Sequence, residues 1–200
     1  MREIVPGVLT WSKLSERHGY DFNGHLLLHP DGNLCIDPVE PDAADLARLV
    51  ELGAARVLLT NRNHGRAANL LREKLDARTA IHPKDADHAR GEGIEIDDAV
   101  LLDDRVGPLR AIGVPGKSPG EIALFWEERA LLIVGDAVIG NPPGQCGILP
   151  DNVVDDPAQL KQSIAALLVL DFDTLLLGDG VSILSGARDR LQELVAGFSG

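Results

Sequence analysis

Cysteine is scarce in this chain of 200 residues, which has only Cys35 and Cys146. Two thiols so far apart in the sequence form neither a zinc-ligand spacing nor a redox motif. A disulfide between them stays open at this point, but a cytoplasmic protein is the simpler interpretation.

Long apolar runs are absent as well. The longest, residues 164–170, is far too short to cross a bilayer. The opening segment Met1–Gly7 contains no apolar core of signal-peptide length. We therefore expect no membrane-spanning helix.

Positive charge is in deficit, with 19 Lys and Arg against 31 Asp and Glu, and the formal net charge is -12. A field of that sign repels phosphate backbones and anionic lipid surfaces. Neither nucleic acid nor a membrane is therefore an expected partner. The acidic residues are scattered rather than run together, which is typical of a solvated surface.

The apolar content, 44% of the residues, is near the norm for globular proteins. The length suits one substantial core, and no low-complexity linker or repeat divides the chain. The sequence thus predicts a single domain over residues 1–200, and nothing in it selects an oligomeric state.

Both halves of the chain mix hairpins with strands that are flanked by helices. Strands at 25–29 and 34–37 enclose the turn Pro30–Asn33, and strands at 122–126 and 131–134 form a second hairpin. The further strands that we expect lie at 8–11, 56–60, 79–82, 93–97, 109–114 and 174–177, with helices after Pro41, from Ala68, from Pro157 and around Leu191. This mixture predicts an α/β (α+β) fold with four layers, an αββα sandwich. A doubly wound sheet is the competitor, but it would contain fewer hairpins.

Polar loops follow several of these strands. The loop Thr60–Arg66 reads Thr-Asn-Arg-Asn-His-Gly-Arg and resembles the Thr-His-x-His-x-Asp-His loop of the metallo-β-lactamase superfamily. In the same order, Gly116–Gly120 resembles that family's Gly-His-Thr/Ser-Pro-Gly, Gly135–Asp136 its Gly-Asp, and Gly178–Gly180 its Gly-His-Gly. The segment 24–38 looks like the family's opening hairpin. The resemblance covers nearly the whole chain, and it implies the αββα sandwich.

The same alignment implies the loss of most metal ligands. In the family, histidines and aspartates of these loops hold two metal ions that activate a bridging hydroxide. The seven ligand positions hold Asn61, Asn63, Gly65, Arg66, Lys117, Asp136 and Asp179. Only Asp136 keeps the family's residue type. Sliding the first loop by one residue places His64 at the second histidine, but Arg62 and Ala67 then occupy other ligand positions.

Arg66 and Lys117 place cations where the family has ligands, and a protonated side chain of either kind cannot coordinate a metal. We therefore expect no cofactor. We also expect the two cations to compensate the buried charge of Asp136 and Asp179. The alternative is one divalent metal ion held by those two aspartates, which the cations oppose.

The expected pocket consists of the positions that align with family ligands, together with His64. Its members are Asn61, Asn63, His64, Gly65, Arg66, Lys117, Asp136 and Asp179. The leading hypothesis is a protein without the dinuclear centre that binds a small anionic ligand or a protein partner there.

Two other functions stay open. One is a hydrolase of an ester, amide, lactone or thioester, which resemblance to the family implies. It would use an altered mononuclear metal site or no metal, and His64 could serve as its general base. The competing interpretation of His64 is an ordinary loop histidine, so the catalytic residues are unknown. The other function is that of a structural subunit in a larger complex.

Overall fold

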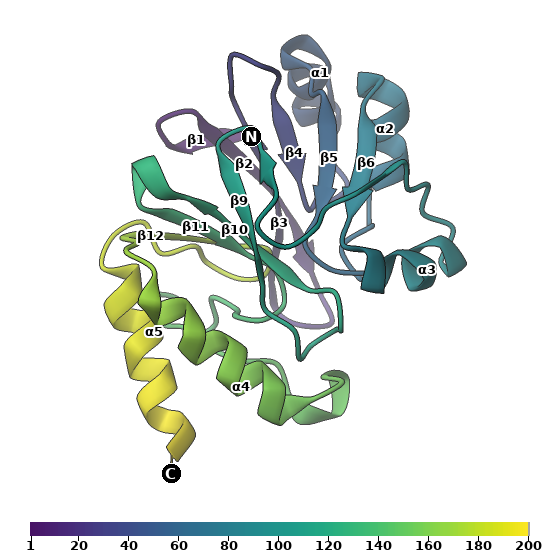
Figure 1. Cartoon of the computed structure of the whole chain (residues 1–200). Helices are drawn as coiled ribbons and strands as arrows, with labels where there is room; N and C mark the ends of the chain where they lie inside the picture. The colour runs from purple at the N-terminus through teal and green to yellow at the C-terminus, as the bar shows by residue number, and fades with distance from the viewer. Residues whose placement is uncertain (200) are drawn as a thin grey trace. The chain divides into compact units, whose positions relative to one another are not determined.

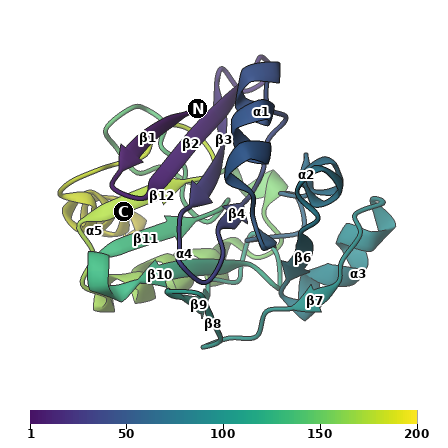
Figure 2. The same ribbon diagram turned by 90° about the horizontal axis from the view of Figure 1, so that it is seen from above.

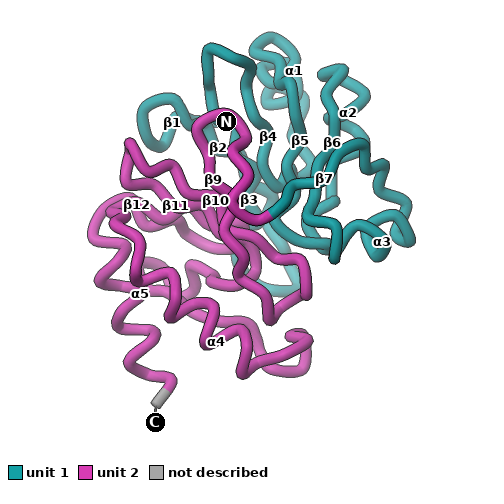
Figure 3. Tube along the Cα trace, viewed as in Figure 1, with its two compact units in different colours: residues 1–101 teal, residues 102–200 magenta. Residues whose placement is uncertain are grey.

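The computed structural model describes residues 1–199 and divides the chain into two compact units (Figure 3). Residues 1–101 form unit 1, and residues 102–200 form unit 2. Each unit contains one sheet and its own helices, as the mixed α/β prediction requires. The prediction of a single domain over the whole chain stays a prediction.

Unit 1 is built on a seven-stranded sheet whose strands follow the chain order. The strands are β1 (Arg2–Val5), β2 (Val8–Ser15), β3 (Tyr20–Leu27), β4 (Leu34–Ile36), β5 (Arg56–Leu59), β6 (Arg78–Ile81) and β7 (Asp98–Ala99). Neighbours from β1 to β4 are antiparallel, and those from β4 to β7 are parallel. The predicted hairpin around 30–33 is thus the β3–β4 connection.

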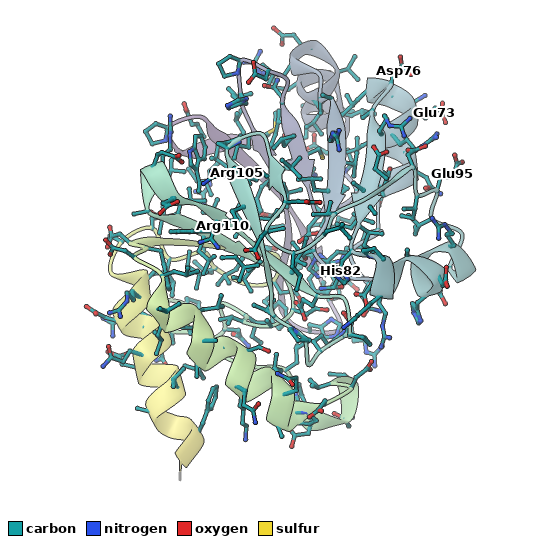
Figure 4. All side chains as sticks on the ribbon, viewed as in Figure 1. Glu73, Asp76, His82, Glu95, Arg105 and Arg110 are labelled. Atoms are coloured by element: carbon teal, nitrogen blue, oxygen red, sulfur yellow. The ribbon has the colours of Figure 1, made fainter. Side chains whose placement is uncertain are left out.

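Three helices belong to unit 1, and α1 and α2 lie beside β4, β5 and β6 (Figures 1 and 2). They are α1 (Ala43–Leu52), α2 (Ala68–Leu75) and α3 (Pro83–Gly91). Leu49 of α1 and Leu71 of α2 join one apolar core with Trp11 of β2. His82, labelled in Figure 4, is the N-cap of α3, where its Nδ1 accepts a hydrogen bond from the backbone of Lys84. A structural role therefore accounts for this histidine.

Unit 2 contains a five-stranded sheet with the order β12-β11-β10-β9-β8. Its elements are β8 (Arg105–Val106), β9 (Leu109–Gly113), β10 (Ile122–Trp126), β11 (Leu131–Val134), β12 (Thr174–Leu177), α4 (Pro157–Ala166) and α5 (Ala187–Ala196). The pairing is antiparallel except between β11 and β12, which are parallel. Alternate residues of these strands, such as Leu132 and Val134, pack with Leu160 of α4 and Leu191 of α5. Figure 1 shows α4 and α5 side by side.

Short 3-10 helices complete the secondary structure. They are η1 (Glu127–Arg129), η2 (Asp151–Val153), η3 (Leu167–Val169) and η4 (Gly197–Ser199). Within residues 1–199, no helix is both long and apolar enough to cross a membrane.

The predicted strand at 93–97 is wrong. That segment is a loop, and the pairing strand is the two-residue β7 that follows it. Gly93 has a φ of 86°, outside the extended region. The carboxylate of Asp97 receives hydrogen bonds from Arg72 at 2.8 and 3.0 Å and from the Thr79 backbone at 2.8 Å. These bonds anchor the loop without a strand ladder.

The disulfide that the sequence left open does not form, because Cys35 and Cys146 are both free thiols.

Candidate functional site

The first candidate loop, Thr60–Arg66, follows β5 in unit 1, and the side chain of Asn61 stabilises its turn. The side chain of Asn61 is fully buried, and its Oδ1 accepts a hydrogen bond from the Asn63 backbone at 2.8 Å. The backbone of His64 also donates to the Asn61 carbonyl oxygen at 3.2 Å. An asparagine that bonds two residues ahead forms an Asx turn. The side-chain oxygen of Asn61 therefore stabilises the loop conformation. The side chain of Asn63 is exposed.

Beneath this loop, Asp37 joins Thr60 and His64 in a buried cluster. Asp37 Oδ1 accepts from the Thr60 backbone at 2.8 Å, and Asp37 Oδ2 accepts from Thr60 Oγ1 at 2.6 Å. The same Oδ2 lies 2.8 Å from Nδ1 of His64. All three side chains are at most 1% exposed. The carboxylate therefore fixes the orientation of the imidazole through Nδ1.

The electrostatics of this cluster favour a charged carboxylate. Burial acts to raise the pKa of Asp37. The charge of His64 and the hydrogen bonds from His64 and Thr60 outweigh burial, so the pKa is lowered. Sequence reasoning did not place Asp37 in the site. The available signal was its position directly after β4, because parallel β4 and β5 end at the same edge of the sheet.

Gly65 and Arg66 complete the loop, and neither offers a metal ligand. A Cβ atom on Gly65 would lie 2.6 Å from Cγ1 of Ile94, so this isoleucine occupies the space that an aspartate side chain would need. The guanidinium carbon of Arg66 lies 4.0 Å from the centre of the Phe22 ring. Guanidinium groups stack well on aromatic faces, and this contact directs the exposed Arg66 side chain along β3.

In unit 2, the loop after β9 carries Lys117, whose charge meets Asp136. Nζ of Lys117 lies 3.1 Å from Oδ2 of Asp136, and the two side chains are 9% and 7% exposed. This contact agrees with the expected pairing of Lys117 with a buried aspartate, whereas charge compensation by Arg66 and at Asp179 stays a prediction. The loop is tied to α4, because the Asp156 backbone donates to the Gly116 carbonyl oxygen at 2.8 Å.

Asp136 and Asp179 follow β11 and β12, and these strands are parallel neighbours. Val134 pairs with Leu177, so both aspartates lie at the same edge of the sheet. The Asp179 side chain is 4% exposed, and its backbone oxygen accepts from the Gly140 backbone at 2.9 Å. Unit 2 therefore holds two buried carboxylates at the positions that sequence reasoning indicated.

A third buried carboxylate in unit 2 was missed. Glu121 is 1% exposed, and its Oε1 accepts a hydrogen bond from the Ala137 backbone at 2.8 Å. Ala137 directly follows Asp136, so Glu121 supports the backbone of that loop. Its sequence signal was weak, because a glutamate beside a glycine turn is usually exposed.

The resemblance aligns seven residues with ligand positions of the family. Among them, Asn61 and Asn63 offer amide oxygens, Gly65 has no side chain, Arg66 and Lys117 offer only cations, and Asp136 and Asp179 offer carboxylates.

Comparison with known proteins identifies the fold. The model of the metallo-beta-lactamase superfamily matches residues 2–198. A hydroxyacylglutathione hydrolase of Synechococcus sp. (strain JA-2-3B'a(2-13)) is 29% identical over 147 residues, which are 68% of this chain and 57% of that protein. The chain therefore spans little more than half of that relative's length.

Solved structures agree. TTHA1623, crystallised in a di-iron-bound form, is 26% identical with a TM-score of 0.68, and the match covers 89% of this chain and 96% of that one. A metallo-beta-lactamase from Erythrobacter litoralis is 17% identical with a TM-score of 0.77, covering 98% and 95% of the two chains. The predicted αββα class is thus confirmed. Because the family model spans nearly every residue, the chain belongs to the metallo-β-lactamase superfamily.

Proposed function

We propose that this protein does not form the dinuclear metal centre of its family and instead binds a small anion. The observation that carries the proposal is the buried ion pair between Lys117 and Asp136, with its distance of 3.1 Å. Asp136 is the one position that keeps the family's residue, and an ammonium already neutralises its carboxylate. At about 4 Å and an effective dielectric constant of about 20, like unit charges repel by about 4 kcal/mol. A dication beside this ammonium would meet roughly twice that repulsion.

The loop of unit 1 supports the same proposal independently. The side-chain oxygen of Asn61 accepts a hydrogen bond in an Asx turn, and Ile94 fills the space next to Gly65. Arg66 carries a charge that repels metal ions. Asn61, Gly65 and Arg66 are therefore poor metal ligands, and we derive no chemical step through a metal.

Arg66 in unit 1 supplies positive charge that an anionic ligand requires, whereas the ammonium of Lys117 is already paired with Asp136. Charged donors bind carboxylate and phosphate oxygens more strongly than neutral donors do. We therefore expect Arg66 to contribute most of the affinity. The ligand is therefore expected to be small and to carry few charges.

Thermal-shift measurements with acetate, phosphate, sulfate and citrate test the proposal. A ligand present at about 100 times its Kd stabilises the folded state by about 2.7 kcal/mol, which raises Tm by several degrees. The Arg66→Ala variant should lose the shift. Arg48→Ala, which removes an exposed arginine of α1, should keep it. A flat response across the whole panel would count against anion binding.

A second function, hydrolysis without the dinuclear centre, is favoured by the Asp37–His64 contact and by the hydrolase relatives. Asp37 holds Nδ1 of His64, so the other ring nitrogen has a defined direction in which to accept a proton. We infer that this imidazole would act as a general base that takes a proton from a water molecule as that water attacks the carbonyl carbon of an ester or thioester.

The assay for this second function uses a hydroxyacylglutathione, the substrate class that the relative's name states. If His64 is the base, His64→Gln abolishes turnover and Asp37→Asn lowers kcat, while a chelator has no effect. Turnover that survives in His64→Gln, or that a chelator removes, would rule out the metal-free base.

A further inference from the structure

Unit 1 contains a cavity of about 490 Å³ that the family's ligand positions do not explain. Small organic ligands typically occupy pockets of about 300–1,000 Å³. Phe22 of β3, Val39 after β4, and Ala67 and Leu70 at the start of α2 line its apolar part. Of the residues aligned with family ligands, the cavity includes only Arg66.

Hydrogen bonds hold the walls of this cavity in place. The indole Nε1 of the buried Trp11 donates to the Val39 carbonyl oxygen at 2.9 Å. The Ala67 backbone donates to the carbonyl oxygen of the neighbouring Pro38 at 3.1 Å. The segment after β4 is thus attached both to β2 and to the start of α2. The cavity is formed by fixed elements and needs no ligand to assemble it.

Charges of both signs surround the cavity, with positive charge in excess. Lys13, which lies directly opposite Phe22 in the β2–β3 ladder, and Arg66 are the cations, and Glu40 is the anion. Nζ of Lys13 lies 3.2 Å from the Glu40 carboxylate, but the two side chains are 59% and 72% exposed. Such exposed pairs contribute little stability, so a ligand can compete for Lys13.

The guanidinium of Arg66 stacks on Phe22, with 4.0 Å between its carbon and the ring centre, and this contact orients it beside the cavity. The nearby start of α2 adds to the positive potential. Its N-cap, Ala67, makes no side-chain hydrogen bond, and its first turn contains no acidic residue. A local excess of positive charge is notable on a chain whose net charge is -12.

We propose that this cavity binds a small organic monoanion with an apolar body, such as an aryl or alkyl carboxylate. Arg66 and Lys13 would receive the carboxylate, and Phe22, Val39 and Leu70 would cover the body. Glu40 disfavours ligands with several negative charges, and the two cations disfavour neutral ones. This site rests on the proposed anion-binding function and specifies its ligand class.

Calorimetric titration with 4-phenylbutyrate tests the site, with acetate and 4-phenylbutanamide as controls. Acetate lacks the apolar body, and the amide lacks the charge. We expect 4-phenylbutyrate to bind at least about tenfold more tightly than either control, as loss of a charged hydrogen bond or of the apolar contact implies. Equal affinity for the carboxylate and the amide, or no binding of 4-phenylbutyrate, would overturn the assignment.

Substitutions in the cavity lining test whether 4-phenylbutyrate binds there. Lys13→Met and Leu70→Gln should each lower the affinity for 4-phenylbutyrate several-fold, and Arg66→Met should lower it further. Lys74→Met serves as the matched control, because Lys74 is an exposed lysine of α2 outside the cavity lining. Circular dichroism and Tm confirm that each variant is folded.

The outcomes separate this inference from the proposed function. If 4-phenylbutyrate binds and neither Lys13→Met nor Leu70→Gln changes its affinity, the cavity is not the site, although anion binding stands. If phosphate or acetate stabilises the protein while 4-phenylbutyrate does not bind, the ligand class is wrong. If no anion binds at all, both proposals fail.

Discussion

Lys117 places a positive charge beside a buried aspartate. Its ammonium lies 3.1 Å from the carboxylate of Asp136. Both groups are nearly buried, so neither charge can be removed without leaving the other one poorly solvated. Removal of one partner alone should therefore destabilise the protein.

Replacing Lys117 by alanine should lower the free energy of unfolding by about 3–5 kcal/mol, because Asp136 would stay as a buried charge. Urea denaturation at pH 7 measures the change. Lys74→Ala, at an exposed position on α2, should change it by less than about 0.5 kcal/mol. A neutral result for Lys117→Ala would show that the ion pair does not stabilise the protein.

Asp37 makes a pH-dependent contribution to the free energy of unfolding. Its pKa in the folded protein is below the ordinary value of about 3.9. A depressed carboxyl pKa stabilises the folded state fully above the unfolded value, and the stabilisation is lost as pH falls through the folded pKa.

Asp37→Asn should therefore be less stable than the unmodified protein at pH 7, and the difference should shrink as pH falls below about 4. Urea denaturation between pH 7 and pH 3 follows this difference. Asp31→Asn, at a position 90% exposed, is the control and should show little difference at any pH. A difference that stays constant down to pH 3 would contradict the lowered pKa.

At the scale of elements, the loop that begins at Gly116 is fixed by close packing onto α4. Gly116 has a φ of 141°, and a Cβ atom there would lie 2.3 Å from Cα of Leu160 in α4. Only glycine permits this approach. The position of the loop that carries Lys117 thus depends on Gly116.

Gly116→Ala should destabilise the protein by more than about 2 kcal/mol, since both backbone strain and a clash with α4 oppose it. Thermal or urea unfolding provides the measurement. Gly91→Ala is the matched control, because nothing lies within 4 Å of a Cβ atom at Gly91 and its φ is not positive. Equal stability of the two variants would mean that the Gly116 loop can move away from α4.

The sequence predicted most elements because their apolar spacing and turn residues were local signals. The β3–β4 hairpin and the cap of α4 at Asp156 are examples. The predicted strand at 93–97 failed because its order comes from Arg72 and Thr79, which lie far away in the sequence. Long-range partners of this kind leave no periodic pattern.

The candidate site was predictable in part for the same reason. Loop motifs indicated Lys117 and Asp136, and the structure pairs them. Asp37 and Glu121 were missed as supports of the loops, since their roles depend on neighbouring strands and on hydrogen bonds to distant backbone groups. Residue type alone did not distinguish them from surface acids.

At the scale of the whole molecule, the chain has the family's fold over residues 2–198, and the sequence resemblance aligns Arg66 and Lys117 with ligand positions of the family. Fold alone does not decide function, so the proposed function depends on the charges of Arg66 and Lys117.

The single-domain prediction has a direct test at this scale. Each unit has its own apolar core, but residues 101 and 102 join them without a linker. We expect one calorimetric unfolding transition, with equal calorimetric and van't Hoff enthalpies. Two separate transitions would show that the units fold independently.

The central claim is the absence of the dinuclear centre, and elemental analysis tests it most directly. Untagged protein is purified without chelator, incubated with zinc, manganese, iron or magnesium, freed of unbound metal and analysed. We predict that no metal is retained near one ion per chain. Stoichiometric retention of any of these metals would contradict the account and show that Lys117 and Arg66 do not exclude a metal ion.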